Sequence, residues 1–226
     1  VRDPSRMAEV LNRVIAKAIR GSAPAQINVP RDFWTQVIDI ELPQIVSFER
    51  PAGGASAIAE AARLLSKAKF PVILSGAGVV IGDAIPECIA LAERLDAPVC
   101  SGYQHNDSFP GSHPLGCGPL GYNGSKAAME LIAKADVVLG LGTRLNPFST
   151  LPGYGIDYWP QDASIIQVDI NADRIGLTKK VTVGICGDAK QVAAQILDQL
   201  AGTAGDDGRE DRKLLIHKSK SGWRQT

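Results

Sequence analysis

The sequence has no excess of either charge. Its 226 residues include 24 Lys and Arg against 24 Asp and Glu, so the formal net charge at pH 7 is zero. A protein that follows a phosphate backbone needs a basic surface, often interleaved with aromatic residues. Aromatic residues make up only 5% of the chain, and no such cluster occurs in it. We therefore expect no nucleic-acid partner.

Long hydrophobic runs and paired cysteines are also missing. The longest apolar runs have the length of a strand, so we expect no membrane partner. Cys88, Cys100, Cys117 and Cys186 are far apart and form no C-x-x-C motif, which argues against a zinc site. Isolated cysteines without a signal peptide indicate a reducing, cytoplasmic location. We predict no metal site in this chain.

Known catalytic motifs are absent from the sequence. It contains no G-x-S-x-G elbow, no H-E-x-x-H and no P-loop, and no pair of carboxylates suggests acid–base chemistry. We therefore predict no complete catalytic constellation within these residues.

What the sequence does contain is a regular alternation of apolar strands and amphipathic helices. This alternation predicts an α/β fold, a parallel sheet with helices on both faces. The predicted strands are Val72–Ser75, Pro98–Ser101, Val137–Leu141, Ser164–Asp169 and Val181–Ile185. The predicted helices between and around them are Ala57–Lys67, Ala84–Leu95, Lys126–Lys134 with Ser125 as its N-cap, and Ala189–Leu200. Two connections, Gly102–Gly124 and Thr143–Ala163, are too long for simple turns and are predicted to be long loops.

The segments around this alternation divide the chain. We predict a central domain over residues 56–201, a linker at 43–55 with Pro and Gly-Gly, and a second linker at 202–226 that holds a short helix. Residues 1–42 contain a helix that opens at Asp3-Pro4 and a strand at Ala25–Val29. One helix and one strand cannot form a domain, so we expect this chain to be a piece of a longer polypeptide.

The segment Ala135–Phe148 provides the first candidate site. A buried strand ends there at a glycine, and ligands in parallel sheets bind where loops leave the carboxyl ends of strands. Gly142, Thr143, Arg144 and Asn146 are therefore candidates for a binding rim. The alternative is that Gly142 only makes a turn and Arg144 is solvated or forms a structural ion pair.

A second candidate is the glycine-rich stretch from Gly76 to Gly82. It follows a strand and includes Gly78, but its third glycine stands one residue later than in a dinucleotide fingerprint. The next strand ends at Cys100-Ser101, without the acidic residue that would bind a ribose. The glycines therefore indicate either a phosphate-binding turn or a tight turn without a ligand, and they disfavour an NAD oxidoreductase.

Polar side chains after other strands are further candidates. Gln104, His105 and Asn106 follow one strand, and His105 is either a general acid–base or a plain surface residue. Asp169 ends another strand and either binds a ribose or adenine edge or caps the following turn. Asp188 is most simply the N-cap of the last helix of the domain.

Five ordered segments carry a resemblance to a known family. They are Pro71–Gly78, His113–Gly116, Ala135–Leu145, Ile166–Ile170 and Gly187–Lys190. In this order and spacing they resemble the central domain of thiamine-diphosphate enzymes of the acetolactate synthase type. Residues 1–42 resemble the end of the preceding pyrimidine-binding domain of those enzymes.

The resemblance implies a cofactor for the parent protein. The parent would bind thiamine diphosphate and Mg²⁺, yet the family's activating glutamate and its Gly-Asp-Gly…Asn-Asn motif do not occur in this chain. We therefore expect this piece to be mainly a scaffold, inactive alone, within a homodimer or homotetramer whose missing flanking domains are its partners. Three loop segments resemble an acyltransferase branch that takes a small sulfonated aldehyde and phosphate to acetyl phosphate and sulfite.

The resemblance also implies site residues. Four residues would lie near the active site of the parent, namely Gln104, His105, Asn106 and Asn146. A nucleotide-type pocket, possibly left empty, would be lined by Gly76, Gly78, Tyr122, Asn123, Gly142, Arg144 and Asp169. Flavin-binding relatives carry Met-His where this chain has Tyr122-Asn123, which disfavours FAD. The alternatives are an FAD-binding acetolactate synthase-like carboligase and a nucleotide-binding module without chemistry.

Overall fold

The computed structural model describes residues 1–21, 23–44, 48–202 and 209–224. By backbone contacts the chain separates into two compact units, residues 1–50 and residues 51–226. This division lies inside the linker predicted at 43–55, whose own limits stay a prediction.

The first unit has one long helix and no core of its own. The helix α1 (Met7–Gly21) follows the short 3-10 turn η1 (Pro4–Arg6), which Asp3 caps by accepting a hydrogen bond from the Ser5 amide at 2.9 Å. This confirms the predicted helix opening. Apolar residues recur along one face of α1, yet none of the described residues of this unit is buried, and Ile19 is 72% exposed.

The strand predicted at Ala25–Val29 is wrong. The structure shows extended backbone without strand pairing there, followed by a 3-10 turn, η2 (Arg31–Phe33). A strand needs a neighbour to pair its backbone N–H and C=O groups. The described part of this unit provides none, so the β-type composition of the segment has nothing to pair with.

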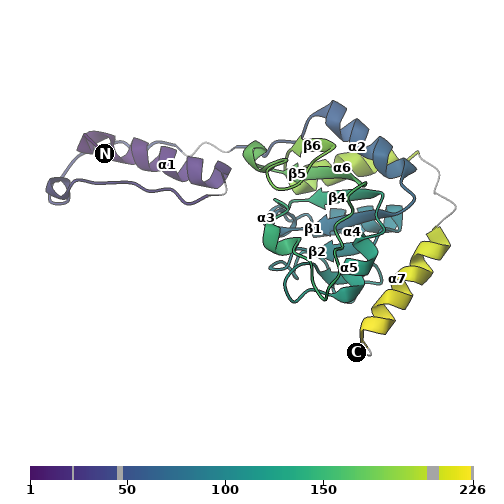
Figure 1. Ribbon diagram of the computed structural model, residues 1–226. Helices are drawn as coiled ribbons and strands as arrows, with labels where there is room; N and C mark the ends of the chain where they lie inside the picture. Colours follow the sequence, from purple (N-terminus) through teal and green to yellow (C-terminus); the bar gives the residue numbers. More distant parts are fainter. Residues whose placement is uncertain (22, 45–47, 203–208, 225–226) are drawn as a thin grey trace. The chain divides into compact units, whose positions relative to one another are not determined.

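The second unit is built on a six-stranded parallel sheet (Figure 1). Its strand order is β3-β2-β1-β4-β5-β6. In chain order the strands are β1 (Pro71–Ser75), β2 (Val99–Ser101), β3 (Gly116–Pro119), β4 (Val137–Leu141), β5 (Ser164–Asp169) and β6 (Val183–Cys186). Every residue of β1 and β4 is buried, as expected for central strands that are covered on both faces.

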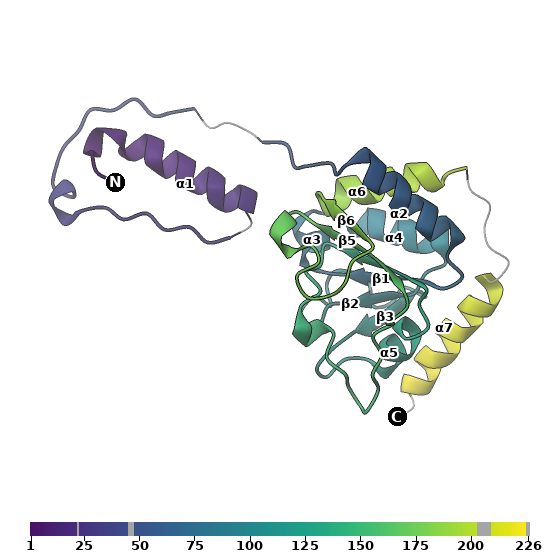
Figure 2. The same cartoon turned by 45° about the horizontal axis from the view of Figure 1, so that its top comes forward.

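Helices cover both faces of this sheet (Figure 2). The helices of this unit are α2 (Ala55–Lys67), α3 (Ala77–Ile81), α4 (Ile85–Leu95), α5 (Lys126–Ile132), α6 (Ala189–Leu200) and α7 (Arg209–Arg224). Helices α2 and α4 each pack against α6, whereas α5 contacts β2, β3 and α7. The crossover from β1 to β2 and the one from β3 to β4 run in opposite directions, and right-handed crossovers then place α4 and α5 on opposite faces.

The predicted α/β class is confirmed, with differences at three places. The connection from Gly102 to Gly124, predicted as a long loop, contains the edge strand β3. The turn expected at Gly76–Gly78 leads directly into α3. The tail, predicted as a linker with a short helix, forms the 16-residue helix α7. Among the described helices, none is both long and apolar enough to cross a membrane.

The predicted helix caps are present. Asp188 accepts hydrogen bonds from the Lys190 and Gln191 amides at 3.1 and 3.3 Å, and Ser125 accepts one from the Ala128 amide at 3.2 Å. Each cap provides a partner for an amide of the first helical turn that has none within its helix.

Truncation of Leu139 tests the central position of β4. Leu139 is fully buried and pairs in register with Ile73 of β1 and Ile166 of β5. Leu139→Ala should lower the free energy of unfolding by about 2–5 kcal/mol, because buried contacts are lost and a cavity remains. Chemical denaturation of the 226-residue chain measures this change.

The matched control is Leu214→Ala, since Leu214 is 69% exposed on α7. It should change the free energy of unfolding by no more than about 0.5 kcal/mol. Equal losses in the two variants would contradict the placement of Leu139 in the core.

Candidate functional site

The carboxyl ends of β1 and β4 form the centre of the candidate site. The two strands are neighbours, and the chain leaves them toward opposite sides of the sheet, which makes their boundary the topological switch point. Ligands of open α/β sheets bind at such points. The structure thus brings together Gly76 and Gly78, which follow β1, with Gly142, which follows β4.

The glycines at this point pack backbone against backbone. The Gly78 amide donates to the Gly142 carbonyl at 2.8 Å, and the Gly76 amide donates to the Leu141 carbonyl at 3.1 Å. A Cβ atom on Gly142, whose φ is +61°, would lie 2.7 Å from the carbonyl carbon of Gly78. Both amides are therefore used within the protein, and the geometry supports the tight-turn interpretation of these glycines.

Hydrogen bonds of its backbone groups hold the rim segment that follows Gly142 in place. Leu145 is fully buried with a φ of +51°, and its amide donates to Thr143 Oγ1 at 3.2 Å. The Thr178 hydroxyl donates to the carbonyl of Leu145 at 2.8 Å. Arg144, which stands between Thr143 and Leu145 in the chain, is exposed. The segment after β4 is therefore fixed by its neighbours, while Arg144 remains open to solvent.

The capping role predicted as one alternative for Asp169 is wrong, because the N-cap of the following turn η4 (Ala172–Arg174) is Asn171, which accepts from the Asp173 amide at 3.0 Å. Asp169 instead stabilises the backbone just before that turn. It is 6% exposed, and its Oδ1 accepts a hydrogen bond from the Asn171 amide at 2.8 Å. Its backbone carbonyl accepts from the Gly187 amide at 3.0 Å. Asp169 therefore holds the backbone that leaves β5, and a nucleotide contact by this residue stays a prediction.

Gln167 is a site residue that the sequence analysis missed. It is 1% exposed and lies within β5. Its Nε2 donates to the carbonyls of Thr143 and Arg174, each at 3.2 Å, and its Oε1 accepts from the Gly176 amide at 2.9 Å. Gln167 therefore joins the loops after β4 and β5. A polar residue inside an otherwise apolar strand, Ile166-Gln167-Val168, was the available signal.

The two long loops meet beside this rim. The Gly121 amide donates to Tyr158 Oη at 3.1 Å, and Tyr154 Oη donates to the Gly124 carbonyl at 3.0 Å. Burial raises the pKa of Tyr158 to about 12, so this phenol stays protonated at neutral pH. Tyr122 is 66% exposed, and Asn123 has a φ of +57°. The contacts fix the loop backbones and leave Tyr122 in solvent.

The residues expected near an active site are polar and largely exposed. Gln104 and Asn106 are exposed, and Asn106 Oδ1 accepts from Ser101 Oγ at 3.3 Å. His105 Nδ1 lies 3.8 Å from an oxygen of the exposed Asp107. Asn146 Oδ1 accepts from the Phe148 amide at 2.8 Å, which caps the turn η3 (Pro147–Ser149). None of these contacts places a general base next to a nucleophile.

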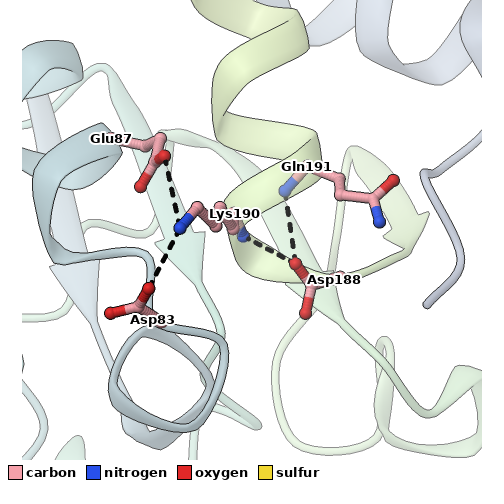
Figure 3. A network of polar contacts seen from close by, with 5 residues as sticks. All are labelled: Asp83, Glu87, Asp188, Lys190 and Gln191. Carbon is pink, nitrogen blue, oxygen red and sulfur yellow. Dashed lines mark hydrogen bonds and ion pairs between the residues drawn. The ribbon is translucent and has the colours of Figure 1, made fainter. Parts of the chain in front are cut away.

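A charged network lies between α6 and the connection from α3 to α4 (Figure 3). Lys190 Nζ lies 3.0 Å from Asp83 Oδ2 and 3.9 Å from Glu87 Oε1. The hydrogen bond to Asp83 raises the pKa of Lys190. Asp83 has a φ of +54°, in the left-handed region that few non-glycine residues adopt. These three residues, also missed by the sequence analysis, connect α3 and α4 to the amino end of α6.

The described residues form no cluster of metal-ligating side chains. No group of three or more His, Cys, Asp or Glu side chains among them could hold a metal ion. Cys88, Cys100 and Cys117 are buried, and burial raises the pKa of Cys88 and of Cys117 to about 12. Such thiols are poor nucleophiles and poor metal ligands, so their role is packing.

Comparison with known families agrees with this fold. Residues 58–196 match the family model described as thiamine pyrophosphate enzyme, central domain. The chain belongs to this family of thiamine pyrophosphate (thiamine diphosphate) enzymes.

Particular relatives are much closer than the family as a whole. The chain is 81% identical over 225 residues to a probable sulfoacetaldehyde acetyltransferase of Rhizobium meliloti (strain 1021). The aligned region covers 100% of this chain and 38% of that protein. The chain is 75% identical to a sulfoacetaldehyde acetyltransferase of Roseovarius nubinhibens, covering 100% of the chain and 37% of that protein. The chain thus spans about 38% of the length of such relatives.

Solved structures show the same fold. The benzoylformate decarboxylase of Polynucleobacter necessarius superposes with a TM-score of 0.73 at 22% identity, over 92% of this chain and 38% of that one. At this identity the likeness concerns the fold alone.

Substitution of Gly142 tests the contact between the glycine turns. Gly142→Ala should destabilise the chain more than Gly155→Ala, a control with a φ of +73° and open space around it. Gly155→Ala should cost about 1–2 kcal/mol, the penalty for a left-handed backbone with a Cβ atom. Gly142→Ala adds a clash with the Gly78 backbone, and denaturant titration measures both variants. Equal costs would show that the close approach contributes nothing.

Proposed function

We propose that this chain is the central portion of a cytoplasmic, thiamine-diphosphate-dependent sulfoacetaldehyde acetyltransferase. The enzyme would convert sulfoacetaldehyde and phosphate to acetyl phosphate and sulfite. The observation that carries the proposal is the 81% identity, over the whole chain, to a relative named for this activity.

The role of this portion within the enzyme is mainly that of a scaffold. The family's activating glutamate and its Gly-Asp-Gly…Asn-Asn motif do not occur in this chain, so we propose that other parts of the whole protein bind thiamine diphosphate and Mg²⁺, which would supply the carbanion chemistry. Gln104, His105, Asn106 and Asn146 belong to loops at the carboxyl edge of the sheet, and we propose that they lie near the active site of the parent. The two loops come close together at Gly102 and Ser149, because a Cβ atom added to Gly102 would lie 3.6 Å from Ser149 Oγ.

The whole protein is proposed to act as a homodimer or homotetramer. The first unit, residues 1–50, bears on the flanking domains, because it exposes the apolar side chains of Leu11, Ile15 and Ile19. An apolar helix face of this kind is covered in a stable protein. We propose that the flanking domains of the longer polypeptide cover it.

The activity test compares the whole protein with this chain. The whole protein should release sulfite from sulfoacetaldehyde only when thiamine diphosphate, Mg²⁺ and phosphate are all present. The 226-residue chain under the same conditions should release none, because the family's cofactor-binding motifs do not occur in its sequence. Sulfite is measured colorimetrically.

Two outcomes would contradict the proposal. Absence of sulfite release by a folded whole protein would reject the activity. A yellow, FAD-containing protein that consumes pyruvate would instead support an acetolactate synthase-like carboligase.

Calorimetric titration tests the nucleotide-type pocket of the chain itself. FAD, ADP, and thiamine diphosphate with Mg²⁺ should each give no binding heat, since the Gly76 and Gly78 amides already donate within the protein. Binding of FAD or ADP that is lost in Arg144→Gln, but kept in the exposed control Lys218→Gln, would make the rim a nucleotide site and contradict the scaffold role.

A further inference from the structure

Helix α7 lies at the amino edge of the sheet, the edge opposite the candidate site. It contacts α5, and its residues Arg212 and Ile216 are each 2% exposed. Together with Lys220 they recur every four residues, so they lie on one face of the helix. Leu214, Lys213 and Lys218 on the same helix are exposed. The inner face of α7 therefore combines the buried Arg212 and Ile216 with the half-buried Leu215 and Lys220.

Arg212 makes three hydrogen bonds to backbone carbonyls. Its Nε donates to Asp96 O at 3.0 Å, its Nη2 to Leu95 O at 2.9 Å and its Nη1 to Lys69 O at 2.6 Å. Leu95 is the last residue of α4, and Asp96 is its C-cap in the left-handed conformation, with a φ of +47°. The last carbonyls of a helix have no partner within it, and a cation there also matches the helix dipole. Arg212 thus supplies this partner from a distant part of the chain.

Lys220 repeats this arrangement two turns further along α7. Its Nζ donates to His113 O at 3.0 Å and to Pro114 O at 2.8 Å. The residues that accept from the two cations have a common position: Lys69 precedes β1, Leu95 and Asp96 precede β2, and His113 and Pro114 precede β3. One helix therefore holds the entries of three neighbouring strands.

We propose that α7 is a strap of the domain, whose release loosens the segments leading into β1, β2 and β3 together. Among its described side chains, helix α7 packs only Ile216 and Leu215 as apolar residues against the core, so the strap opens at a lower free energy than the apolar core around β4. Arg212 and Lys220 fasten it to backbone carbonyls, and Lys213 adds an ion pair to Asp96, with 3.5 Å between Nζ and Oδ1. This inference concerns the conformation of the chain and does not rest on the proposed function.

Hydrogen exchange of the 226-residue chain tests the strap. In Arg212→Met the α7 amides should exchange faster by about tenfold or more, the factor expected when charge-assisted hydrogen bonds are lost. The amides of Phe70, Ala97 and Leu115, which lie in the three entry segments and are hydrogen-bonded, should exchange faster in parallel. The amides of β4 should keep their protection.

Lys220→Met and Lys218→Met form a matched pair that keeps the test decisive if Arg212→Met fails to fold. Lys220→Met should accelerate exchange in α7 and around Leu115, whereas Lys218→Met, on the exposed face, should change neither. The proposal is overturned if α7 is unprotected in the unmodified chain. It is also overturned if α7 exchanges faster in the variants while the entry segments keep their protection.

Discussion

The close approach of two backbones at the end of β1 and β4 constrains the carboxyl edge of the sheet. Gly142 lies against Gly78 without a side chain between them, and the Gly78 amide donates to the Gly142 carbonyl. Any larger residue at either position would push α3 away from the strand beside it. Because α3 leads into the connection that Lys190 of α6 holds through Asp83, this contact also affects how α4 and α6 meet.

The opposite edge of the sheet is organised by cations instead of glycines. Arg212 and Lys220 of α7 donate to carbonyls that precede three strands. Asp136 has the complementary role before β4, since its carboxylate accepts from the Lys69 and Phe70 amides at 2.7 and 2.9 Å. Backbone groups at the strand entries are thus paired by side chains distant in the chain, which satisfies polar groups that the sheet ladder itself leaves unpaired.

The candidate site shows which of its features residue types alone predict and which ones only the three-dimensional structure reveals. The glycine stretch after β1 and the strand ending at Gly142 were identified from apolar runs that end in glycine, and the structure brings them together at the switch point. Their amides, however, are used in mutual hydrogen bonds, which no local pattern reveals. The turn after β5 is capped by Asn171 and not by Asp169, and Gln167 was missed because its three partners come from separate loops.

The sequence by itself determined the alternation of strands and helices, the α/β class, the caps at Ser125 and Asp188, and the resemblance to thiamine-diphosphate enzymes. These features depend on local periodicity and on motifs of contiguous residues. Only the tertiary structure decided that Ala25–Val29 forms no strand, that β3 pairs with β2, and that the tail becomes α7 with a buried arginine. Each of these outcomes depends on whether a distant segment supplies a hydrogen-bond partner, and spacing along the chain carries no information about that.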